Sequence, residues 1–246
     1  MPSFANLQLA LTARTEAAQE KILYVITAYM DTQGLMPCRR ESAERTVRIG
    51  REEDGLWAVF DDCADRLDIQ ALDGLGRCLT GKLRTGAVGV MGSGEGRMLR
   101  LYVDGRLWDT YLRAPAVLSQ EGGGFPKGLR LPPRNRLGGR SRAIRWLPVL
   151  RPGHTVRELS DAFLRGTQPG LDDFRELLLL GRSAEAGFAS VEEDGGAFFP
   201  GTVTLYFCTA NRVRQGLLDR LLKPASRTAA STGALIRPAR YRMWGA

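Results

Sequence analysis

The chain has 246 residues and a mass of 27.1 kDa, with 43% apolar residues, 25% charged residues and a formal net charge of +8. These values are typical of a folded protein with a hydrophobic core, and they exclude a disordered, collagen-like, coiled-coil or disulfide-rich chain. No stretch approaches the roughly 20 consecutive apolar residues that a membrane-spanning helix needs.

The first predicted elements are a strand, a helix and two further strands. Leucines at every second position predict a strand over residues 6–13. Apolar residues spaced by three and four positions predict a helix that follows Thr15 and ends at Gly34. The next two strands are predicted over residues 45–50 and 55–60, on either side of a polar turn.

A second helix and three more strands are predicted next. Asp68 is placed to cap a helix whose apolar stripe runs from Ile69 to Leu83. A glycine-rich loop and an Asp-Gly turn then separate strands over 86–92, 97–104 and 106–112. Runs of antiparallel strands broken by helices favour an α+β fold, with an antiparallel or mixed sheet and helices on one face.

The pattern breaks in residues 119–145, a stretch rich in Gly, Pro and Arg with no usable periodicity. It is predicted to be a linker or a functional loop. An N-terminal α+β domain is therefore expected over 1–118, a smaller α+β subdomain over 146–224, and a basic flexible tail over 225–246. If the two folded parts share one core, the stretch is an excursion loop instead.

The expected subdomain contains helices and strands of its own. Thr155 and Glu158 form a T-x-x-E capping box ahead of a helix, and another helix is expected over about 171–180. Strands are predicted over 186–192 and 201–209, and a last amphipathic helix contains the leucines at 217, 218, 221 and 222.

The positive charge is concentrated in two segments, 119–145 and 211–246, whereas the rest of the chain is mildly acidic. Arginine neutralises phosphate, and the aromatic residues nearby could stack on unpaired bases, so these segments are candidates for nucleic-acid binding. The alternative is a solvated linker and tail. The candidate residues are Lys127, Arg130, Arg134, Arg136, Arg140, Arg142, Arg145, Arg237, Arg240 and Arg242.

The residues that carry chemistry form no complete catalytic pattern. The four cysteines make no C-x-x-C pair, and the only histidine, His154, precedes a helix start. Asp61, Asp62, Asp65 and Asp68 follow a strand, where clustered carboxylates could bind a divalent cation. Their spacing lacks the order of a calcium loop, and a solvated turn that begins a helix is the competing interpretation, so no metal or cofactor is assigned.

These patterns favour a non-enzymatic protein-binding or accessory protein, comparable to a bacterial immunity or regulatory partner. Phe198 and Phe199 are candidate partner contacts, because aromatic anchors dominate interface energetics. A cytoplasmic location is expected, since the N-terminal residues lack the features of a signal peptide. The alternatives are a nucleic-acid-binding accessory protein that uses the two basic segments and a metal-dependent enzyme built on the Asp61–Asp68 cluster. Oligomeric state is left open.

Overall fold

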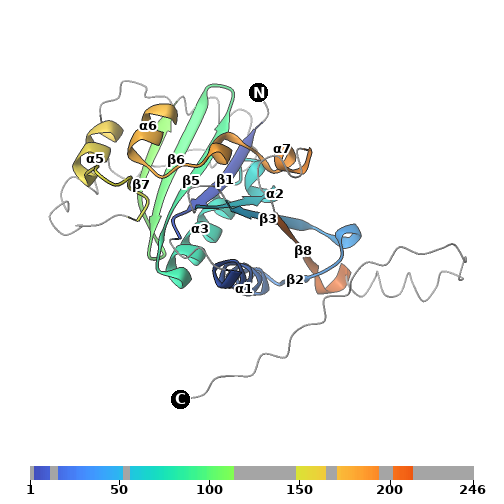
Figure 1. Ribbon diagram of the computed structural model, residues 1–246. Coiled ribbons are helices and arrows are strands. Elements are labelled where there is room, and N and C mark those ends of the chain that lie inside the picture. Colours follow the sequence, from blue (N-terminus) through green and yellow to red (C-terminus); the bar gives the residue numbers. More distant parts are fainter. Residues whose placement is uncertain are drawn as a thin grey trace, which may run out of the picture.

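The computed structural model describes residues 3–11, 16–51, 56–113, 148–164, 171–193 and 202–212. One antiparallel sheet of eight strands, in the order β2-β8-β3-β4-β1-β5-β6-β7, forms its centre (Figure 1). The expected α+β class is confirmed, and the sheet is antiparallel. Its strands are β1 (Phe4–Leu9), β2 (Leu35–Pro37), β3 (Arg45–Arg51), β4 (Trp57–Asp61), β5 (Gly86–Ser93), β6 (Gly96–Val103), β7 (Arg106–Arg113) and β8 (Val203–Thr209).

Two long helices, α1 (Glu16–Thr32) and α3 (Ile69–Leu83), cover one face of the sheet. Both are amphipathic, and their apolar stripes pack on the side chains that β1, β3, β4 and β5 present to that face. This larger core contains Leu7, Ile22, Ile26, Val59 and Leu72, all fully buried. A short 3₁₀ turn, η1 (Arg40–Ser42), follows β2, and a short helix, α2 (Asp62–Asp65), follows β4.

Residues from the second half of the chain cover the other face (Figure 1). They form α5 (Val156–Leu164), α6 (Leu171–Leu177), the 3₁₀ turn η2 (Arg182–Glu185) and α7 (Phe188–Glu193). The sheet is therefore sandwiched between two helical layers, with α1 and α3 on one side as expected for the first helices. Among the described residues, no helix is both long and apolar enough to cross a membrane.

Strand β8 lies between β2 and β3, although about 150 residues of chain separate it from β3. Val47 pairs with Leu205 and Arg45 with Phe207. Phe207 is fully buried and joins the core beneath α1. A strand from the C-terminal part of the chain thus contributes to the core of the N-terminal part.

One predicted strand is wrong. Residues 186–192 were expected to be extended, but residues 186 and 187 connect η2 to helix α7, and residues 188–192 lie in α7. The apolar residues Phe188 and Val191 are three positions apart and pack on Ala58 and Phe60 of β4. A spacing of three positions places both side chains on the same face of a helix.

Helix α3 is attached to β6 by a buried polar group. Asp73 accepts hydrogen bonds from the Tyr102 hydroxyl at 2.6 Å and from the Arg100 guanidinium at 2.8 Å. Gly76, in the same helix, lies so close to Tyr102 that a Cβ atom would stand 2.9 Å from the ring. The glycine, unfavourable for a helix by about 1 kcal/mol, therefore permits a close approach of helix and sheet.

The predicted cap of α3 is confirmed. Asp68 Oδ1 accepts hydrogen bonds from the backbone N–H groups of Gln70 at 2.9 Å and Ala71 at 3.1 Å. We expect Asp68→Ala to lower the free energy of unfolding by about 1 kcal/mol, because two N–H groups lose their acceptor. Urea denaturation would measure this effect against Asp31→Ala, which removes an exposed carboxylate near the end of α1. Equal effects of the two substitutions would contradict the capping role.

Candidate functional site

The aspartates that were candidates for metal binding lie at the turn from β4 into α2. Asp61 is 2% exposed, and both of its carboxylate oxygens accept hydrogen bonds from Arg45. Asp61 also accepts the backbone N–H of Cys63 at 3.1 Å and so caps α2. Burial alone would lower the pKa of Arg45, but the hydrogen bonds and charge of Asp61 raise it above its usual value.

Asp61, Asp62 and Cys63 each place one possible ligand atom within 4.8 Å of the others. Burial raises the pKa of Asp62, and burial together with the two neighbouring carboxylates raises the pKa of the Cys63 thiol to about 11. A cation bound here would compete with the Arg45 guanidinium for Asp61. The contacts within the described residues are those of an ion pair and a helix cap.

Asp65 has a different role from the one its spacing suggested. Its Oδ1 atom accepts the backbone N–H of Ala5 at 2.8 Å, and the carboxylate also accepts the N–H groups of Phe188 and Ala189. Burial raises the pKa of Asp65, and these hydrogen bonds oppose the shift. The residue therefore connects β1, α2 and the first turn of α7.

His154 lies in the loop before α5. Its Nδ1 atom is 3.5 Å from Glu158, with 37% of its side chain exposed. Glu158 also accepts the backbone N–H of Thr155 at 2.7 Å, and the Thr155 hydroxyl accepts the N–H of Glu158, which confirms the predicted capping box. The described contacts of His154 are those of a residue at a helix start.

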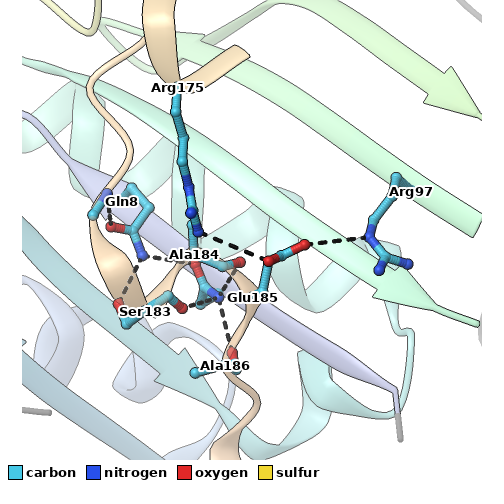
Figure 2. A network of polar contacts seen from close by, with 9 residues as sticks. Gln8, Arg97, Arg175, Ser183, Ala184, Glu185 and Ala186 are labelled. Carbon is cyan, nitrogen blue, oxygen red and sulfur yellow. Dashed lines mark hydrogen bonds and ion pairs between the residues drawn. The ribbon is translucent and has the colours of Figure 1, made fainter. Parts of the chain in front are cut away.

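The most extensive polar network joins β1 to η2 (Figure 2). The Asn6 amide donates to three backbone carbonyls, those of Ser183, Ala184 and Ala186, at 2.9–3.1 Å. Gln8 donates to the Asn6 side chain and to the Ser183 hydroxyl, and it accepts the backbone N–H of Gly181. Because Asn6 and Gln8 are almost fully buried, this network fixes η2 against the middle of the sheet.

A charged group lies at the surface end of the same network. The two carboxylate oxygens of Glu185 are each 3.9 Å from a guanidinium nitrogen, one of Arg97 and one of Arg175 (Figure 2). Arg97 also stacks over the Phe4 ring, 5.2 Å from its centroid. These ion pairs are long, so they contribute little to stability.

A candidate binding surface among the described residues is the side of β2, β8 and β3 that faces away from α1. We call it the open face and define it by Met36, Thr46, Arg48, Thr204 and Tyr206. Thr46 pairs with Tyr206 and Arg48 with Thr204, which places all four side chains on one face of the sheet. Met36 is 39% exposed, and Thr46, Thr204 and Tyr206 are half-buried.

Helix α7 covers the open face only at its border, where it contacts Arg48. Its apolar residues pack on β4, and within the described part of the chain no helix packs over Thr204 or Tyr206 on this side. Arg48 lies at the border, with its guanidinium 4.6 Å from the Phe188 ring centroid. The opposite side of the same strands carries Val47 and Phe207, which α1 buries.

Two arginines at the border share one carboxylate. Glu192 of α7 lies 2.9 Å from Arg48 and 3.1 Å from Arg40. The Arg40 side chain is 70% exposed, whereas Arg48 is largely buried and its Nε atom has no hydrogen-bond partner among the described residues. Arg40 and Arg48 together carry two positive charges, and Glu192 neutralises one of them.

A pair of thiols lies beside the open face. Cys38 follows β2, and its side chain hydrogen-bonds the buried Cys208 thiol. Burial, followed by this neighbour, raises the pKa of Cys38 to about 12. Such a thiol stays protonated near neutral pH, so it is a poor nucleophile.

The other candidates from the sequence lie outside the described residues. This holds for the partner contacts Phe198 and Phe199 and for every proposed nucleic-acid-binding residue, from Lys127 to Arg145 and from Arg237 to Arg242. The open face was missed because its residues come from three strands that are distant in the sequence. The one available signal was the exposed-side alternation of Thr204 and Tyr206 within the predicted strand 201–209.

Comparisons with protein-family models, with curated proteins and with solved structures gave no match.

Proposed function

We propose that this protein is a non-enzymatic binding protein whose protein partner docks on the open face. The observation that carries the proposal is the grouping of Tyr206, Met36 and Arg48 on one side of the sheet, where no described helix packs over Tyr206. Tyrosine, methionine and arginine are the residue types enriched at protein interfaces. A sheet held by helices on its opposite side presents them with little loss of conformational entropy on binding.

The charge at the border favours a partner with exposed carboxylates. Arg40 and Arg48 share Glu192, and Arg48 retains an N–H group without a partner in the described chain. The Arg40 side chain is 70% exposed, so a carboxylate of the partner could reach it and supply the missing negative charge. We therefore propose an acidic protein segment as the occupant, with Tyr206 as its apolar anchor.

Site-specific photo-crosslinking in the native host tests this proposal. A benzophenone side chain at Thr204 is expected to trap a protein that mass spectrometry can identify, because Thr204 lies within the open face. The matched position is Tyr24, which is 66% exposed on α1, on the other side of the sheet. Equal trapping of one protein from both positions would count against the open face.

The purified partner then allows a quantitative test with two tyrosines. Tyr206→Ala should weaken binding about 10- to 100-fold, as expected for an aromatic anchor at the centre of an interface. Tyr24→Ala removes an equally large side chain from the opposite side and should leave the affinity unchanged. Isothermal titration calorimetry measures both, and the melting temperature of each variant verifies folding. Unchanged affinity in Tyr206→Ala would refute the proposal.

Salt dependence separates this proposal from the nucleic-acid alternative. Binding to phosphates through the two basic segments should weaken by orders of magnitude as salt is raised, because condensed counterions are released. An anchor of Tyr206 and Met36 depends mainly on apolar burial and should change far less. A nucleic acid recovered from the Thr204 crosslink, with a steep salt dependence, would support the alternative instead.

A further inference from the structure

Strand β7 forms one edge of the sheet and is long for an edge strand. It has eight residues, whereas the opposite edge strand, β2, has only three and ends in a proline. Proteins usually shorten or block edge strands, because unpaired backbone groups can pair with another chain. Among the described residues, no strand pairs with the outer side of β7.

Two charges on β7 have no oppositely charged neighbour among the described residues. The register of β7 on β6 shifts once and is regular from Asp109 to Arg113, so Asp109, Tyr111 and Arg113 share one face. Across the ladder, Asp109 faces Leu101, while Arg113 faces another cation, Arg97. Like charges at directly opposite positions destabilise a sheet.

Asp109 is only 6% exposed, and its one hydrogen bond among the described residues comes from the adjacent backbone N–H of Thr110. A largely buried carboxylate without a cation is costly unless it gains one. An arginine that reached Asp109 from the side of β7 opposite β6 would remove this cost.

We propose that β7 pairs with β7 of a second copy of this chain, antiparallel and about a two-fold axis at Tyr111. In this register Asp109 stands opposite Arg113 of the second copy, and Arg113 opposite its Asp109. Thr110 and Leu112 face each other on the other side of the sheet. The result is an isologous dimer with one continuous sheet of sixteen strands.

Symmetry and charge together select this register. Opposite residues of an antiparallel pair share a face, so the two-fold axis must pass through a residue rather than between two residues. An axis at Thr110 places Asp109 opposite Tyr111, and an axis at Leu112 places Arg113 opposite Tyr111. Of these three, only the axis at Tyr111 pairs both charges with opposite ones.

Sedimentation velocity of the full-length protein tests the proposal. The wild-type chain should form a dimer at concentrations of about 10 to 200 µM, the range expected for a small edge-to-edge interface. Arg113→Asp places two pairs of like charges in the interface, and the dissociation constant should rise at least about tenfold. Arg113→Lys keeps the charge and should retain most of the association.

The control is Arg106→Asp, which makes the same charge change on β7 outside the paired residues 109–113. It should leave the dimer largely intact, and circular dichroism should show that all variants are folded. The inference is overturned if the wild-type chain remains monomeric over this range. It is also overturned if Arg106→Asp and Arg113→Asp weaken association equally. The open face lies at the other end of the sheet, so the inference is independent of the proposed function.

Discussion

Asp61→Ala is expected to lower the free energy of unfolding by about 3 to 5 kcal/mol, the usual effect of leaving one buried charge without its partner. Asp61 is 2% exposed, and its carboxylate holds the Arg45 guanidinium in the space between β3, β4 and α1. The substitution also removes the acceptor for the Cys63 N–H group at the start of α2. Urea denaturation measures the loss directly.

A double substitution distinguishes a buried ion pair from a general packing defect. If the loss arises from the unpaired charge of Arg45, then Arg45→Met combined with Asp61→Leu should be less destabilised than Asp61→Ala alone, because the double variant contains no buried charge. The exposed substitution Asp31→Ala should have almost no effect. A double variant less stable than Asp61→Ala would show that the shape of the pair, rather than its charge, stabilises the fold.

Features that depend on neighbouring residues were predictable from the sequence. The cap formed by Asp68, the capping box of Thr155 and Glu158, and the Asp104–Gly105 turn each involve residues within three or four positions. In the turn, both residues adopt positive φ angles, +46° and +78°, as the Asp-Gly sequence predicts for a tight hairpin. Local backbone chemistry determines such features almost completely.

Features that depend on distant residues were not predictable. Asn6 and Gln8 alternate with the leucines of the first predicted strand, but β1 lies in the middle of the sheet and both of its faces are buried. The partners of Asn6 lie about 180 residues further along the chain. The aspartates of the candidate metal cluster likewise contact Arg45, Ala5 and α7. No periodicity encodes contacts of this kind, because they depend on which strands become neighbours.

The candidate binding surfaces follow the same rule. The open face combines three strands, and β8 reaches its place between β2 and β3 only through the fold. By contrast, the charges of β7 are four residues apart on a strand that the sequence predicted almost correctly. Their significance depends on β7 being an edge strand, which is again a property of the whole sheet.

The second large effect is expected for Asn6→Asp, which changes one nitrogen to oxygen and leaves the size of the side chain unchanged. The Asn6 amide donates to the carbonyls of Ser183, Ala184 and Ala186, and it is 1% exposed. A carboxylate at this position cannot donate and would direct negative charge toward three carbonyl oxygens. We expect a loss of at least about 3 kcal/mol in the free energy of unfolding at neutral pH, since a buried charge would be left without a partner.

Hydrogen exchange can locate this loss. If the Asn6 amide fixes η2 to β1, amides in residues 182–186 should exchange faster in Asn6→Asp than the overall loss of stability explains. Asn211→Asp makes the same chemical change at an exposed position and should alter neither stability nor exchange near η2. The defect should also shrink as the pH falls, because a protonated carboxyl group recovers one donor. Uniform acceleration across the sheet, with no excess at η2, would mean that Asn6 stabilises β1 itself rather than the attachment of the second helical layer.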